Sequence, residues 1–504
     1  MDRHRRNHRT GRAGIALAAA VLALAGTTGA ADVPSQIGGG NVMVQRDLSE
    51  AARQLAVLQD LGCGMCRIPL SESIYFSPRD KRPHPEQCDA LLLLCHRHGV
   101  TPIFLFEYYT RWNGPLGGYE KWRAVGRAFA ERFRPGSAWL ESKGVRGWGV
   151  RVYTAVNEPT WKSNNPEPIP PDAYARALEG LADGVHGVDP NLRVSPGGYI
   201  EGSLARGKCP YAKAAAPLFN AGKLHSIDIH RYWDVQHIPW QGTRRWSLQS
   251  QFDQVKRDCG ITADVRFHTT EMNVKRRKIS EDEAARMFLT ALWDALGIVG
   301  GRGQRVTEFV MPWNIFHTAD KDEHYGLCEE LDPWQPTARG KVLRLVCRLA
   351  KGMTFTACRP RDKGEFVLEG GGRKIWVWQN REAWTEHPGP AYTVNDLLPG
   401  ATALEVYRWN SWSGPWRSFD VRGKRSFSVD GLEVGETYMF LARPQAAACR
   451  GRTVFRGNSR PPDGLTCRGR TRLRRGGCSR PAAHPPPNTK PQHEETRNDP
   501  HDPA

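Results

Sequence analysis

The segment Val152-Tyr153-Thr154-Ala155-Val156-Asn157-Glu158-Pro159-Thr160-Trp161 decides how the rest of the chain is interpreted. Its first half is apolar and β-branched, which is typical of a strand buried on both faces. Pro159 ends that strand, because proline has no N–H to donate to a neighbouring strand. We therefore expect Glu158 at the carboxyl end of a buried strand, which is where ligands bind in parallel α/β folds.

A second segment, Val265-Arg266-Phe267-His268-Thr269-Thr270-Glu271-Met272-Asn273, is also strand-like and also leads into a carboxylate. The Asn-Glu-Pro triplet of the first segment, taken alone, does no more than close a strand and open a loop. Two carboxylates at two strand ends are different, because retaining glycoside hydrolysis uses such a pair. One protonates the leaving oxygen, and the other, about 5–5.5 Å away, attacks the anomeric carbon.

Strand-like and helix-like runs alternate through residues 32–352. Besides the two segments above, strands are expected at 36–44, 65–70, 101–108, 192–196, 226–232 and 306–314. Helices with a 3.6-residue apolar period are expected at 48–61, 86–98, 119–142, 171–185, 212–221, 247–259, 280–296 and 337–349. Eight strand-then-helix units favour an α/β fold of the (β/α)8 TIM-barrel type over an open sheet.

The pattern changes after residue 352. Short alternating strands at 365–368, 374–379, 403–409, 417–421, 426–429 and 437–442 predict a small antiparallel β-sandwich at 353–444. No periodicity is found at 445–504, where Arg, Gly, Pro and His are abundant. We interpret 445–504 as a disordered, basic, proline-rich tail.

Composition describes a globular protein and limits its partners. The chain has 504 residues with 39% hydrophobic content, and its mean hydropathy is -0.55. The formal net charge of +18 raises the question of a nucleic-acid partner. Much of the excess lies in the two ends of the chain, and no nucleic-acid-binding module stands between them. We therefore expect no role in nucleic-acid binding. A protein that binds polyanions through its arginine-rich tail is a further alternative hypothesis.

The first 31 residues have the pattern of a signal peptide. A basic start is followed by a short apolar run and small residues up to Ala30 and Ala31, which predicts export to the periplasm or the medium. No other stretch is long and apolar enough to predict a membrane span. The 12 cysteines show no small-domain disulfide framework, and the C-x-x-C of Cys63 and Cys66 lacks a second pair at zinc spacing.

Several polar and aromatic residues fall at the expected strand ends. They are Arg67, Asn157, Glu158, His230, Tyr232, Glu271 and Trp313. The two-residue period of a strand puts His230 and Tyr232 on one face. Each residue taken alone can be explained by a structural role, such as an ion pair at the barrel rim for Arg67 or a core position for Trp313. Together they occupy five strand ends in order, and we expect them to face one mouth.

This set resembles glycoside hydrolase clan A, and its spacing is most similar to family 5. Family 39 is the next resemblance, through the Asn-Glu-Pro and Thr-Glu-Met-Asn segments, and the likeness covers about residues 35–350. The resemblance implies that Glu158 is the general acid/base and Glu271 the nucleophile. It also implies that Arg67 and Tyr232 contact Glu271 and keep it ionised.

The resemblance assigns the remaining residues to the substrate. Asn157 would bind the sugar 2-hydroxyl, His230 would lie beside the acid/base, and Trp313 would form the floor under the sugar. Trp112, Trp161 and Trp233 follow strands three, four and six, and are expected to line further sugar subsites. An aromatic floor suits a sugar, because the π-face is negative and the sugar C–H groups are partly positive.

Elementary chemistry supports the two catalytic roles. A nearby guanidinium lowers the pKa of a carboxylate and keeps a nucleophile anionic. An acid keeps its proton through burial or a negative neighbour. This mechanism requires no cofactor and no metal. The loop residues Asp320, Asp322, Glu323 and His324 are more typical of a solvated charge cluster than of a metal site.

One position departs from the family 5 pattern, which has a His after strand three. This chain has Phe106-Glu107-Tyr108-Tyr109 there, so Glu107 is either a third active-site carboxylate or a rim ion pair. The leading hypothesis is an exported retaining β-glycosidase that acts on a carbohydrate substrate. The alternative is a catalytically inactive carbohydrate-binding barrel.

Overall fold

The computed structural model describes residues 32–42, 48–200, 204, 207, 209–233, 247–276, 279–316, 325–329, 333–361, 363–381 and 388–444. The chain divides into the compact unit Met1–Ala446 and the unit Ala447–Ala504, and every described residue belongs to the first. Three predictions lie outside the described residues: the signal peptide at 1–31, the tail at 445–504, and the charge cluster of Asp320, Asp322, Glu323 and His324.

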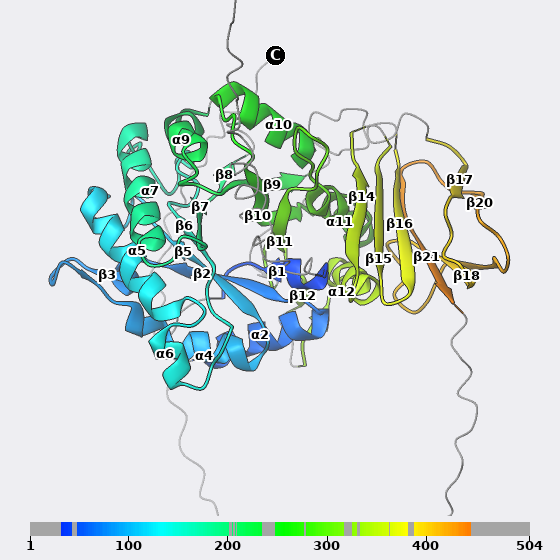
Figure 1. Cartoon of the computed structure of the whole chain (residues 1–504), viewed down its shortest axis with the longest axis horizontal. Coiled ribbons are helices and arrows are strands. Elements are labelled where there is room, and N and C mark those ends of the chain that lie inside the picture. The colour runs from blue at the N-terminus through cyan, green and yellow to red at the C-terminus, as the bar shows by residue number, and fades with distance from the viewer. Residues whose placement is uncertain are drawn as a thin grey trace, which may run out of the picture. The chain divides into compact units, whose positions relative to one another are not determined.

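The first half of the unit builds a five-stranded sheet. Its strands run parallel in the order β1 (Gly38–Gly39), β2 (Met65–Leu70), β5 (Thr101–Phe106), β6 (Val152–Ala155) and β7 (Arg193–Pro196). The helices between them are α2 (Ser49–Leu61), α3 (Glu72–Tyr75), α4 (Asp89–Arg97), α5 (Tyr119–Phe133), α6 (Ala138–Ser142) and α7 (Pro171–His186). In Figure 1, α5 and α7 lie outside the strands β5 and β6.

The next part of the chain builds a four-stranded parallel sheet. Its strands are β8 (Tyr199–Ile200), β9 (Ser226–Trp233), β10 (Arg266–Val274) and β11 (Thr307–Pro312), in the spatial order β11-β10-β9-β8. Its helices are α9 (Pro210–Asn220), α10 (Leu248–Cys259), α11 (Glu281–Leu296) and α12 (Ala338–Ala350). Short pairs are formed by β3 (Phe76–Ser77) with β4 (Arg82–Pro83) and by β12 (Cys328–Glu329) with β13 (Gln335–Pro336).

The two parallel sheets are joined at both edges. Ile37 and Val310 form a parallel bridge between the start of the first sheet and β11. At the other edge, the N–H of His225 donates to the carbonyl of Val194 over 2.8 Å. An apolar cluster that includes Val152 and Phe309 draws side chains from both sheets. The predicted α/β fold with parallel strands and alternating helices is therefore confirmed.

Two expected elements differ from the structure. Of the strand expected at 36–44, the described residues 36–42 form only the two-residue β1, where glycines provide no side chains to stabilise a longer pairing. The helix expected at 119–142 is two helices, α5 and α6, separated at Arg134 and Pro135. Arg134 is extended, with ψ 153°, because a residue that precedes proline is disfavoured in the helical region.

The last part is antiparallel. The strands β14 (Thr354–Arg359), β15 (Glu365–Gly370), β16 (Arg373–Asn380), β21 (Glu436–Pro444), β18 (Ala401–Tyr407) and β19 (Arg417–Asp420) form one sheet in that order, and β17 (Ala391–Val394) pairs with β20 (Phe427–Asp430). β14 and β17 are strands that the sequence did not predict. Tyr392 of β17 stacks on Trp378 and Phe440, with ring centroids 4.8 and 4.9 Å away, so the pair packs on the sheet.

The antiparallel sheet contacts helix α11 through buried polar groups. Thr290 and Thr437 are hydrogen bonded at 2.8 Å, and the amide of Gln379 donates to the Thr290 carbonyl at 2.9 Å. Among the described residues, no helix has the length and apolar character that crossing a membrane requires.

Candidate active site

The chain leaves β6 through an unusual backbone. Val156 and Glu158 both have positive φ, 60° and 44°, a region that is costly for non-glycine residues and especially for β-branched ones. Such conformations cost about 1–3 kcal/mol each and cluster at functional sites. Here they are held by the hydrogen bonds from Val156 N–H to Phe106 O at 3.0 Å and from Trp161 N–H to Glu158 O at 2.9 Å. The turn fixes the backbone that carries Glu158.

Strand β10 presents Glu271 through an irregularity. Its pairing with both β9 and β11 shifts register before Met272, so Thr270 and Glu271 fall within a bulge. A bulge re-aims side chains locally and is common beside active sites. The Glu271 backbone is held by a hydrogen bond from the Thr269 hydroxyl to its carbonyl, at 3.0 Å.

The bulge and the β6 turn bring the two predicted glutamates together. One carboxyl oxygen from Glu158, one from Glu271 and one ring nitrogen from His230 all lie within 4.8 Å of one another. His230 Nδ1 is 2.7 Å from Glu158 Oε1 and 3.7 Å from Glu271 Oε2. Among the described residues, these three are also the group whose side chains lie close enough together to bind a metal ion, with one ligand atom from each.

Glu271 has the environment of a permanent carboxylate. Arg67 Nη2 donates to its Oε1, and the Tyr232 hydroxyl donates to its Oε2 at 2.6 Å. Burial alone would raise the pKa of Glu271, but the positive charges of His230 and Arg67 and the Tyr232 hydrogen bond outweigh it and lower the pKa below its usual value. The group is therefore anionic at neutral pH, as a nucleophile has to be.

Arg67 is fixed by acceptors on all sides. Its side chain is 1% exposed, and it donates to Asn41 Oδ1 from Nε at 3.2 Å and from Nη2 at 2.9 Å. Nη1 donates to Thr270 Oγ1 at 3.0 Å. The rim ion pair considered for Arg67 is therefore a buried pair with Glu271, embedded in a hydrogen-bond network.

Asn157 and Glu107 are linked through a tyrosine. The amide of Asn157 donates to the Tyr109 hydroxyl at 3.0 Å, and that hydroxyl donates to Glu107 Oε1 at 3.2 Å. Burial raises the pKa of Glu107, and the charges of Glu271 and Glu158 add to this effect while Arg67 opposes it. The charges of Glu271 and Glu158 therefore act on Glu107 as well, and Glu107 belongs to the same candidate site.

An aromatic wall lies beside Tyr232. The Trp313 ring meets the Tyr232 ring edge-on with centroids 6.1 Å apart, and Tyr325 is 5.0 Å from Tyr232 and 5.2 Å from Trp313. The amide of Asn273 donates to the Trp313 and Tyr325 carbonyls, which fixes both residues. Trp313 is half-buried, so it retains surface for a ligand.

The three outer tryptophans differ. Trp112 and Trp161 are 64% and 44% exposed, and Trp112 packs edge-on against Tyr109 of the site at 5.3 Å. The prediction that Trp233 lines a sugar subsite is wrong. β9 extends to Trp233, so strand alternation turns it away from the face of Tyr232, and it is 1% exposed in the apolar core.

Several site residues were missed by the sequence reasoning. They are Asn41, Tyr109, Asp228, Thr270 and Tyr325, each hydrogen bonded to, ion paired with or packed against a predicted site residue. Asp228 carried a usable signal, because it lies two residues before His230 on the same strand face. Asn41 carried none, since it follows the two-residue β1 outside regular structure.

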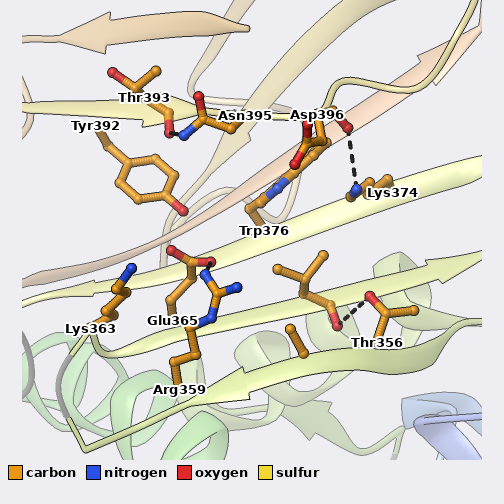
Figure 2. A pocket seen from close by; sticks show the side chains of 12 residues that line it. Thr356, Arg359, Lys363, Glu365, Lys374, Trp376, Tyr392, Thr393, Asn395 and Asp396 are labelled. Carbon is orange, nitrogen blue, oxygen red and sulfur yellow. Dashed lines mark hydrogen bonds and ion pairs between the residues drawn. The ribbon is translucent and has the colours of Figure 1, made fainter. Parts of the chain in front are cut away.

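A second polar hollow lies on the antiparallel sheet (Figure 2). At one end Arg359 pairs with Glu365 at 3.2 Å, and at the other Lys374 donates to the Asp396 carbonyl at 3.2 Å. Trp376 forms part of the lining but is only 4% exposed, so it offers little ring surface. The hollow lacks the carboxylate pair and the aromatic wall of the first site.

No protein-family profile matches the chain, and no curated protein matches its sequence. Solved structures do match. A family 39 glycoside hydrolase from the gut symbiont Bacteroides cellulosilyticus WH2 has a TM-score of 0.52 and 15% identity, covering 82% of this chain and 81% of that one. A glucosidase from Croceicoccus marinus has a TM-score of 0.55 and 14% identity, covering 78% and 92%.

A third match is the bacterial orthologue of human α-L-iduronidase, with a TM-score of 0.53 and 13% identity over 83% of both chains. These identities are low, so what the chain shares with the three proteins is their fold. Glycoside hydrolases are among the solved structures that share this fold, so the predicted resemblance is confirmed at the level of the fold.

Proposed function

We propose that this protein is a retaining glycoside hydrolase that cleaves β-glycosidic bonds in oligo- or polysaccharides by double displacement. The observation that carries the proposal is the approach of the Glu158 and Glu271 carboxyl oxygens to within 4.8 Å. Inverting enzymes need about 6.5–9.5 Å between these groups to admit a water molecule, whereas retaining enzymes use about 5–5.5 Å. The separation here favours direct attack by a carboxylate.

Glycosylation assigns each glutamate one task. Glu271 attacks the anomeric carbon, while Glu158 gives a proton to the leaving oxygen as the glycosidic bond breaks. Arg67 and Tyr232 hold Glu271 ionised until the bond forms. Forming the glycosyl ester removes the negative charge beside Glu158, so the pKa of that group falls and it becomes the base.

Deglycosylation reverses these tasks. Glu158 takes a proton from water, the water oxygen bonds to the anomeric carbon, and Glu271 leaves with the electrons of the ester bond. Two inversions give net retention of configuration. Asn157 is proposed to bind the sugar 2-hydroxyl and Trp313 to stack under the ring, with Trp112 and Trp161 at outer subsites.

The same proposal covers the architecture and the location. The bridge between Ile37 and Val310 and the hydrogen bond from His225 to Val194 support one closed (β/α)8 barrel made of both parallel sheets. Packing of the β17–β20 pair on the six-stranded sheet supports a C-terminal β-sandwich. The pattern of residues 1–31 supports export.

The proposal is tested with a panel of nitrophenyl β-glycosides. We expect at least one to be hydrolysed, and Glu271→Gln to lower the rate by about 10⁴-fold or more, as loss of a nucleophile does in other enzymes. The matched control is Glu120→Gln, since Glu120 has a side chain 79% exposed on α5 and should keep full activity. Sugar binding without hydrolysis by the wild-type protein, unchanged in Glu271→Gln, would support the inactive-barrel alternative and overturn the proposal.

A further inference from the structure

Thr270 stands at the meeting point of three polar partners. Its Oγ1 is 2.7 Å from Asp228 Oδ2, 2.8 Å from His230 Nε2 and 3.0 Å from Arg67 Nη1. All four side chains are 0% or 1% exposed, so these hydrogen bonds are formed between buried protein groups. None of the functional assignments made above uses Asp228 or Thr270.

The donors and acceptors of this network can be counted. A hydroxyl has one hydrogen to donate and two lone pairs to accept with, and a guanidinium only donates. Burial would raise the pKa of Asp228, but His268 and His230 and the Thr270 hydrogen bond outweigh it and lower the pKa, so Asp228 is an ionised acceptor. The hydroxyl therefore donates to Asp228 and accepts from Arg67. Its remaining lone pair requires a hydrogen on His230 Nε2.

A hydrogen on Nε2 decides what His230 presents to Glu158. In the neutral ring, Nδ1 is then an acceptor, and a proton in the 2.7 Å contact with Oε1 belongs to Glu158. In the charged ring, that proton belongs to Nδ1. In both forms a single proton lies between the two groups. The other neutral tautomer would donate to the Glu158 carboxylate and stabilise its ionised form, which leaves Glu158 without the proton that a general acid has to give.

The His230 ring is also held in place sterically. Gly198 has φ of 111°, and a Cβ there would lie 2.1 Å from His230 Nε2. Any larger residue would collide with the ring, so the glycine permits this close contact. The ring is thus packed against backbone on one side and tied to Thr270 and Glu158 at its two nitrogens.

We propose that Asp228 and Thr270 are positioning residues that keep a proton on His230 Nε2, so that Glu158 and His230 hold the catalytic proton as one unit. The proposal rests on the hydrolase function above and deepens it. When the glycosidic bond breaks, its electron pair stays with the leaving oxygen, which takes the proton from the Glu158 carboxyl group. The attacking water later returns one proton to Glu158 as its oxygen bonds to the anomeric carbon.

The charges around His230 set the pH at which Glu158 and His230 lose their shared proton. Glu271 faces His230 from β10, Asp228 from β9 and Glu158 from the end of β6. Tyr232 and Arg67 both donate to Glu271. Burial lowers the pKa of His230, but the three negative charges outweigh burial and raise the pKa to about 9. The unit keeps its proton at neutral pH, and the alkaline limb of activity reports its loss.

The first experiment compares pH profiles of kcat/KM for a poor leaving group. Asp228→Asn keeps the hydrogen-bond acceptor but removes the charge, so we expect the alkaline limb to fall by about 1 pH unit or more. Thr270→Val removes the acceptor for Nε2, and we expect the same downward shift with a rate loss of about 10–100-fold. Thr270→Ser restores the hydroxyl and should restore most of the profile.

The matched control is Thr154→Val, since Thr154 is equally buried on β6 and its hydroxyl donates to Phe104 O at 3.0 Å, away from the site. We expect its profile to be that of the wild type. A dinitrophenyl leaving group, which needs no acid, should show a smaller loss in Thr270→Val than a poor leaving group. An unmoved alkaline limb in both Asp228→Asn and Thr270→Val would overturn the proposal.

The second experiment does not need activity. Nitrogen NMR of the histidine-labelled full chain, assigned by difference against His230→Gln, reports which ring nitrogen carries hydrogen. We expect a protonated Nε2 at every pH, and loss of this signature in Thr270→Val. A neutral ring with hydrogen on Nδ1 in the wild type overturns the inference. Absence of hydrolysis with a protonated Nε2 overturns the proposed function instead.

Discussion

The candidate active site and the hollow on the antiparallel sheet both contain acidic, basic and aromatic residues, yet they differ in how the charges are arranged. In the candidate active site, Glu158 and Glu271 both lie within 3.7 Å of His230 Nδ1, and both carboxylates raise the pKa of His230. In the hollow, Arg359 has its own partner, Glu365. Charges that are buried and shared can exchange protons, whereas paired surface charges mostly solvate a face.

The largest difference in activity between the candidate active site and the hollow is expected when Glu158, the proposed acid/base, is replaced. Glu158→Ala should lower kcat for poor leaving groups by about 10²–10⁴-fold, because acid assistance is lost. Azide should restore turnover with an activated aryl glycoside and give a glycosyl azide, since a small anion fits the space left and needs no base. Glu365→Ala in the hollow is the control and should leave the rate unchanged. Equal losses in the two variants would remove the distinction drawn here.

A smaller effect is expected at Arg67. The pKa of Glu271 lies below its usual value, so activity persists on the acid side until that carboxylate is protonated. Arg67→Gln removes one of the two positive charges that face Glu271, so the pKa rises and the acid limb of kcat/KM moves up by about 1–2 pH units. Arg359→Gln should not move the limb. A limb unchanged in Arg67→Gln would show that the guanidinium does not set the state of the nucleophile.

Replacement of Trp233 and of Trp313 is expected to change two different measured quantities, stability and KM. Trp233→Ala empties a core position, so we expect about 3–5 kcal/mol less stability in denaturant unfolding. Trp313→Ala should mainly raise KM, because a half-buried ring beside Tyr232 loses its contact with the sugar. The reverse pattern, with a KM effect at Trp233 and a stability loss at Trp313, would contradict the placement of both rings.

Strand periodicity predicted the residues of the candidate active site wherever the strands are regular. His230 and Tyr232 were placed by the two-residue alternation of β9, and the strand-end glutamates meet as expected. Thr270 could not be found in this way. It precedes Glu271 directly, so simple alternation would turn one of them outward, and only the register shift in β10 lets both reach the interior. Trp233 was misplaced because β9 runs one residue beyond its expected end.

Contacts between segments that lie far apart along the chain could not be predicted from the sequence either. The Asn157–Tyr109–Glu107 chain joins the end of β6 to the end of β5, and neither hydrogen bond has a local signature. Asn41 supports Arg67 from a segment with almost no regular structure. Residue type and spacing therefore indicated where the site is and which acids it contains, while the partners that tune them needed coordinates.

The central claim is that Glu271 attacks the sugar directly across the short gap to Glu158. Proton NMR of the first seconds of hydrolysis of an aryl β-glycoside tests it, because the anomers of the released sugar are resolved before they equilibrate. The account predicts that the β-anomer forms first and that the α-anomer grows in later by mutarotation. Release of the α-anomer first would show inversion by water and would contradict the role of Glu271 as nucleophile.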